Sequence, residues 1–104
     1  MPFTTKTLNA FEMTGRLAAC ENTAKRPGSR AFIGVYPPSE KDRRWLVRRF
    51  EIPVILVNQY FGEEDLEDSE MVWLDHLEEV EAQLDSWGVD SSTLDAPWKS
   101  DYPL

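Results

Sequence analysis

The side chains best suited to chemistry in this chain are carboxylates, which gather in its last third. Six of them crowd one short segment: Glu63, Glu64, Asp65, Glu67, Asp68 and Glu70. Oxygen atoms at this density can hold a hard cation, but calcium-binding loops space their ligands at alternate positions around a glycine at the sixth. Here Gly62 precedes the acids and no glycine lies among them. We therefore predict no metal site in this segment.

Residues that could support catalysis are few. A nucleophilic mechanism needs a base, usually histidine, beside the nucleophile. The single histidine, His76, is expected in the first turn of a helix, and no Gly-x-Ser-x-Gly context accompanies it. The single Cys20 excludes an internal disulfide and a multi-cysteine zinc site. Glycine-rich loops that cradle phosphates are also missing from the sequence. We predict a protein that is not an enzyme and needs no cofactor.

The strongest signal is the division of charge along the chain. Residues 1–60 contain ten Lys or Arg and five Asp or Glu, whereas residues 61–104 contain fourteen Asp or Glu and one base, Lys99. Carboxylates this crowded repel one another unless positive charge faces them. That charge comes either from the basic half of the same chain or from a basic partner.

Bases interleaved with Trp45 between residues 41 and 49 look like a nucleic-acid-binding helix: Lys41, Arg43, Arg44, Arg48 and Arg49. The pI of about 4.5 argues against direct nucleic-acid binding, because nucleic-acid modules are usually basic as wholes. The acids of residues 63–70 could instead fold back over these arginines. The longest apolar run, residues 52–57, is much shorter than the roughly 20 residues of a bilayer span. We expect no membrane association and a cytoplasmic location.

Hydrophobic spacing and turn residues predict the elements of the first half. A helix is expected over residues 8–22, capped by Thr7, and a strand over residues 30–36. A second helix should begin at Ser39, whose side chain can accept from the amide of Asp42, and end at Pro53. Residues 54–57 are expected as a buried strand or turn, and residues 58–69 as an acidic surface loop.

The second half gives the clearest local signals. A strand over residues 71–74 should lead into a helix that begins at Asp75, with Glu78 completing a capping box. One apolar helix face is predicted to contain Leu77, Val80, Leu84 and Trp87. Gly88 supplies the left-handed stop, beyond which Val89 can contact that face. The tail, residues 90–104, contains Leu94, Trp98, Tyr102 and Leu104, and we expect it to dock on the domain as an extended segment.

Together these elements predict a single α+β domain over residues 1–104. We expect a short mixed sheet of about three strands packed with about three helices, followed by the extended C-terminal tail. The length and the 41% apolar content suit one hydrophobic core.

In its small size, its acidity and its lack of catalytic motifs, the chain resembles the immunity proteins of bacterial toxin systems, such as those of contact-dependent growth inhibition. The resemblance lies in general character and not in a residue pattern, so it assigns no residue a role. It implies an inhibitor that binds a cognate toxin, often a basic nuclease domain. We expect the contact at the acids of residues 63–70, at Glu78, Glu81 and Asp85, and at Trp98. The alternative is an acidic nucleic-acid mimic, such as a phage-encoded anti-defence protein.

Overall fold

The computed structural model describes residues 2–57, 59 and 61–104, and its described part forms one four-stranded sheet and two α-helices. The strands are β1 (Ala18–Asn22), β2 (Ser29–Tyr36), β3 (Trp45–Pro53) and β4 (Glu67–Leu74), and they lie in the order β1-β2-β3-β4. The helices are α1 (Thr5–Thr14) and α2 (Leu77–Ser86). The α+β class is confirmed. The expectation of a mixed sheet with three strands and three helices is wrong. The sheet has four strands, all antiparallel, and the described residues form two α-helices.

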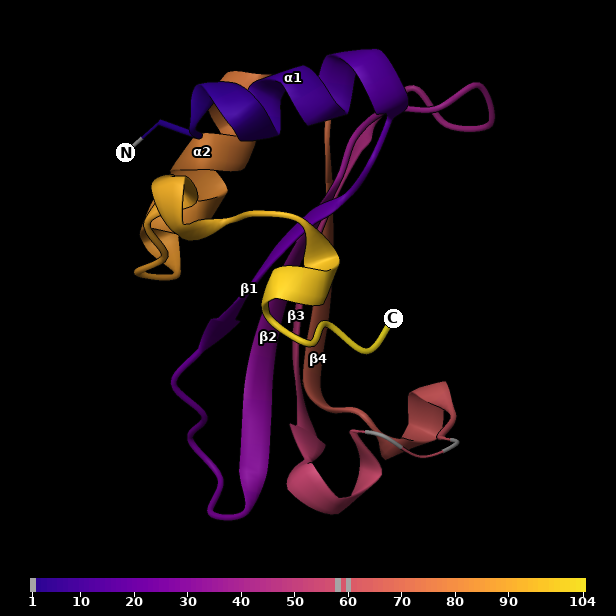
Figure 1. Ribbon diagram of the computed structural model, residues 1–104, viewed down its shortest axis with the longest axis vertical. Coiled ribbons are helices and arrows are strands. Elements are labelled where there is room, and N and C mark those ends of the chain that lie inside the picture. Colours follow the sequence, from indigo (N-terminus) through magenta and orange to yellow (C-terminus); the bar gives the residue numbers. More distant parts are fainter. Residues whose placement is uncertain (1, 58, 60) are drawn as a thin grey trace.

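Alternate residues of a strand point to opposite sides of the sheet, and here both faces are covered. On one face, Ile33 and Val47 pack with residues of the two helices, including Val80 and Leu84. On the other face, Phe32 and Phe50 pack against Tyr102 of the C-terminal tail. Figure 1 shows both helices at one end of the sheet and the tail, in yellow, crossing the middle of the strands. We call these the helical face and the tail face.

The helix expected over residues 8–22 is wrong in its second part, because residues 18–22 form strand β1. The helix ends at Thr14, because Gly15 takes a left-handed conformation (φ 62°) that stops it, and the chain then enters β1. The N-cap is Thr4 and not Thr7: the Thr4 side chain accepts from the Thr7 amide at 3.2 Å. The buried Thr7 hydroxyl donates instead to the carbonyl oxygen of Leu94.

The helix expected from Ser39 is wrong, since most of that segment is β3. The Ser39 hydroxyl accepts from the Asp42 amide as expected (3.3 Å), but the contact closes a loop turn. From Trp45 the chain is extended, with Val47 on the helical face and Phe50 on the tail face. The apolar positions therefore lie on two faces of one strand, and the bases interleaved with them form no helical stripe.

The segment between β3 and β4 also differs from expectation. Of residues 54–57, expected as a buried strand or turn, Val54–Leu56 form the 3₁₀ turn η1, in which Val54 and Ile55 are exposed, whereas Val57 is buried as expected. The acidic loop expected over residues 58–69 contains a second turn, η2 (Glu63–Asp65), and ends where β4 begins at Glu67. Positions 58 and 60 of that expected loop lie outside the described residues.

The strand–helix unit predicted in the second half is confirmed. Residues 71–74 lie within β4, and Val80 and Leu84 of α2 are fully buried, with Leu77 and Trp87 packed beside them. The helix begins one position later than expected: the N-cap is His76, whose amide donates to Glu79 at 3.1 Å. At the other end Gly88 is left-handed (φ 72°), and the Val89 amide donates to the Leu84 carbonyl oxygen.

The C-terminal tail is docked on the domain, as expected, but it is not extended throughout. It contains two 3₁₀ turns, η3 (Ser91–Thr93) and η4 (Pro97–Lys99), and buries Leu94 on the helical face and Tyr102 on the tail face. Tyr102 lies directly over Gly34, where a side chain would overlap its hydroxyl, and that hydroxyl lies 2.9 Å from the hydroxyl of Tyr36. The tail therefore forms part of the core.

Candidate partner-binding surface

The six acids of residues 63–70 lie on η2 and on the first half of β4, and arginines of the same chain compensate several of them. Arg48 pairs with Glu63 at 3.1 Å, and Arg49 pairs with Glu70 at 2.8 Å. Asp65 accepts from the Gly62 amide at 2.9 Å. The pairing of the acids with the basic residues 41–49, which the sequence left open, is therefore present for Arg48 and Arg49. It does not extend to Arg44, which pairs with Asp42.

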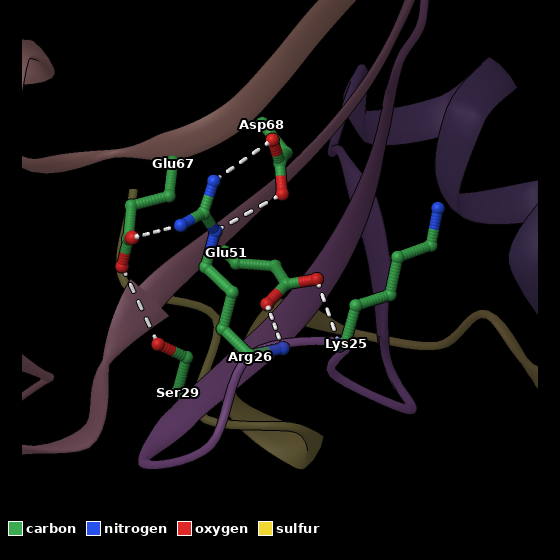
Figure 2. A network of polar contacts seen from close by, with 6 residues as sticks. All are labelled: Lys25, Arg26, Ser29, Glu51, Glu67 and Asp68. Atoms are coloured by element: carbon green, nitrogen blue, oxygen red, sulfur yellow. Dashed lines mark hydrogen bonds and ion pairs between the residues drawn. The ribbon is translucent and has the colours of Figure 1, made fainter.

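A third arginine, which the sequence did not single out, engages two more of these acids. Arg26 belongs to the loop between β1 and β2, and its guanidinium lies between the carboxylates of Glu67 and Asp68, as Figure 2 shows (3.2 and 3.1 Å). The hydrogen bonds from Arg26 and its positive charge hold the pKa of Asp68 below its usual value. These two acids therefore tie that loop to the start of β4.

The same network contains Glu51, a carboxylate that sequence reasoning missed. Glu51 is buried on β3 and accepts from the amides of Lys25 and Arg26 at 2.9 and 3.1 Å (Figure 2). Its signal in the sequence was a lone charge between Phe50 and Ile52. Buried carboxylates require such partners, and this one shapes the loop that positions Arg26.

The acids of α2 are in a different situation. Glu78 and Asp85 are exposed on the side away from the buried Val80 and Leu84, whereas Glu81 is half-buried at the flank of that face. In residues 2–57, 59 and 61–104, no basic side chain pairs with Glu78 or Glu81. No basic residue occupies the last turn of α2 either, although cations stabilise that end of a helix. These three acids are called the α2 stripe (Glu78, Glu81 and Asp85), and within it Glu78 and Glu81 add negative charge that no Lys or Arg of the described residues neutralises.

Trp98 lies on η4, apart from both acidic groups. Its side chain is 62% exposed, and the guanidinium of Arg16 stacks 4.9 Å from the ring centroid. The predicted contact residues therefore occupy three places: the η2–β4 segment, α2 and the tail. Glu70 is linked to the C-terminal end of α2 through Arg49, which pairs with Glu70 and also stacks on Trp87 at 4.5 Å.

The structure also contains an apolar cleft that the sequence analysis did not identify. It lies on the tail face, where Tyr102 leaves the strands uncovered, and has a volume of about 310 Å³. Its floor is one cross-strand row, in which Tyr36 lies opposite Leu46 and Leu46 opposite Trp73, with Leu17 alongside. Arg44 at the rim stacks on the Trp73 ring at 4.8 Å. The available signal was the apolar strand predicted over residues 71–74, but locating the cleft also required the strand register.

Groups suited to covalent chemistry do not come together in the described part of the chain. His76 is exposed at the start of α2, whereas Cys20 is buried in β1. Burial raises the pKa of the Cys20 thiol, which keeps it in the less nucleophilic protonated form. No group of three His, Cys, Asp or Glu side chains among the described residues is arranged to hold a metal ion.

Comparison of the chain with protein-family models, with curated proteins and with solved structures finds no significant match. Neither helix in the described part of the chain has the length and apolar character needed to cross a bilayer.

Proposed function

We propose that this chain is a non-enzymatic binding protein that works in the cytoplasm and neutralises a basic bacterial toxin, as immunity proteins do. The observation that carries the proposal is the contrast between the two acidic groups. Arginines of the same chain compensate Glu63, Glu67 and Asp68, whereas Glu78 and Glu81 have no such partner among the described residues. Glu78 and Glu81 on α2 therefore carry the charge that is left for another molecule.

The physical basis is electrostatic steering. A nuclease domain presents positive charge to phosphate groups, and an acidic surface accelerates association with it. The net charge of −8 acts in the same direction over the whole molecule. Such an inhibitor works by stoichiometric cover of the toxin, so it needs no turnover.

The test is the rate of association with the partner. A tagged chain is purified from its native host, the one-to-one companion is identified by mass spectrometry, and binding is measured at rising salt. Charge reversal in Glu78→Lys with Glu81→Lys should slow association about tenfold at low salt. The difference should shrink above about 0.1 M salt, where the Debye length falls to about 10 Å.

Glu12→Lys is the matched control, because Glu12 is an exposed acid on the other helix. Its reversal changes the net charge without altering the α2 stripe. For an equal change in charge, it is compared with the single variant Glu78→Lys. Equal slowing of association by these two variants would contradict a localised contact. An association rate that is insensitive to salt would contradict the steering argument itself.

The alternative, a nucleic-acid mimic, has less support. A mimic needs free carboxylates spaced along a surface in place of phosphates. In this chain, Glu67 and Asp68 pair with Arg26, and Glu70 pairs with Arg49. Carboxylates available for such an array are therefore restricted to α2.

A further inference from the structure

The two edges of the sheet are treated differently. At the β1 edge, the tail adds a short bridge: Ala19 and Asp95 exchange both main-chain hydrogen bonds, at 2.8 and 3.0 Å. At the β4 edge, no further strand pairs with β4 in the described part of the chain. An open edge presents unpaired main-chain donors and acceptors to any extended segment nearby.

The first half of β4 contains features that discourage such pairing. Glu67, Asp68 and Glu70 place charges along it, and Asp68 has a left-handed backbone (φ 51°) beside a shift in register with β3. Charges and bulges are common means of blocking edge-to-edge pairing. From Met71 to Leu74 the strand contains neither: it is uncharged and stays in regular register with β3.

The unblocked half adjoins the apolar cleft. Met71 and Trp73 share the tail face, lie at the edge of the sheet and are 53% and 44% exposed. The cleft also presents Tyr36 and, at its rim, Arg44. Trp, Tyr and Arg are the residues that most often anchor protein interfaces. At about 310 Å³ the cleft lies at the lower end of the roughly 300–1,000 Å³ of small-molecule pockets, a size that also suits one or two partner side chains.

The charge around the second half of β4 indicates which kind of partner fits it. Between Glu67 and Asp85 the chain has eight acids and no Lys or Arg. The cation at the rim, Arg44, is neutralised by Asp42 at 3.0 Å. Two copies of this chain, each with a net charge of −8, repel one another. Complementarity therefore favours a basic segment over a second copy.

We propose that the second half of β4 docks an extended basic and apolar segment of the partner, which joins the sheet as a fifth strand. Its apolar side chains enter the cleft beside Trp73. Because strand side chains alternate, its Lys or Arg side chains point to the helical face, the side of the sheet on which the acidic helix α2 packs. This inference rests on the proposed function and specifies the form of the partner.

The test uses the full chain and two synthetic probes. The first is a fluorescent peptide of alternating valine and lysine; the second has the same sequence and charge, but its main chain is N-methylated so that it cannot pair as a strand. We expect the first to bind, to slow amide exchange in residues 71–74, and to bind about tenfold or more tightly than the second. Trp73→Ala should weaken binding of the first peptide about tenfold.

Met71→Lys provides a second variant, because Met71 is exposed and its replacement leaves the core intact. It places a cation on the tail face of β4, two positions from Trp73, and should also weaken binding of the first peptide. Equal binding of both peptides, or binding without protection of residues 71–74, would overturn strand addition and leave a charge-driven interaction standing. Failure of both peptides to bind would also overturn strand addition. The proposed function is tested separately, by the rate of association with the native companion. Concentration-dependent protection without peptide would assign the edge to a second copy and overturn the inference.

Discussion

Replacement of Tyr102 by alanine should show how strongly the tail stabilises the fold. The Tyr102 ring is buried against Phe32 and Phe50, with ring centroids 6.1 and 5.7 Å away, and its hydroxyl pairs with that of Tyr36. Truncation of a buried aromatic side chain to alanine costs about 3–5 kcal/mol. Since a loss of 1 kcal/mol lowers the Tm of a domain of this size by about 4–8 °C, Tyr102→Ala should lower it by roughly 12 °C or more.

Milder variants separate the hydrogen bond from the packing. Tyr102→Phe keeps the ring and removes one hydrogen bond, which should cost about 0.5–1.5 kcal/mol. Tyr36→Phe removes the same bond but leaves the more deeply buried Tyr102 hydroxyl without this partner. Because an unsatisfied buried hydroxyl costs about 1–3 kcal/mol, Tyr36→Phe should be the more destabilising of the two.

An independent variant tests the same docking from the sheet side. A Cβ atom at Gly34 would overlap the Tyr102 hydroxyl, so Gly34→Ala should displace the tail. Urea unfolding followed by circular dichroism gives the free energy of unfolding of each single variant and of the double variant. If the tail is the cause, Gly34→Ala should cost much less in the Tyr102→Ala background than alone. Strict additivity, or a loss below about 1 kcal/mol for Tyr102→Ala, would refute the docked tail.

Three further predictions concern the C-terminal end of α2 and the network of Figure 2. Gly88→Ala places a Cβ on a left-handed residue (φ 72°) and should lower the free energy of unfolding in urea by about 1–2 kcal/mol. Glu51→Ala leaves the amides of Lys25 and Arg26 without their acceptor, so both should exchange faster and stability should fall by about 1–3 kcal/mol. The lowered pKa of Asp68 means that its pairing with Arg26 stabilises the fold above the unfolded value of about 3.9 and that this contribution is lost as the pH falls through the lower folded pKa. The stability difference between the native chain and Asp68→Asn should therefore shrink below about pH 4, and no change across that range would contradict the pairing.

The parts of the fold that the sequence predicted correctly depend on local signals. The apolar face of α2 and the left-handed stop at Gly88 need only their neighbours along the chain. The segment from Ser39 to Pro53 failed for a physical reason: both faces of β3 are covered, so its buried residues lose the simple alternation of a half-exposed strand. Leu46, Val47 and Phe50 then match helical spacing equally well.

The candidate surface shows the same limit. Counting charges revealed the acidic excess, but Arg26 lies 42 positions from the Asp68 that it binds, and no local pattern connects them. The cleft depends on the register that places Tyr36, Leu46 and Trp73 in one row across three strands. The α2 stripe was accessible to sequence reasoning because one helix contains all of it.

Cys20 gives the molecule a built-in reporter of its own opening. It is the single cysteine of the chain, and it lies in β1 within the core of the helical face, where burial keeps its thiol protonated. A thiol-specific reagent therefore reacts only when β1 separates from its surroundings, so the labelling rate measures how often that happens. A partner that joins the far edge at β4 would slow this labelling without touching Cys20, provided that the four strands open together.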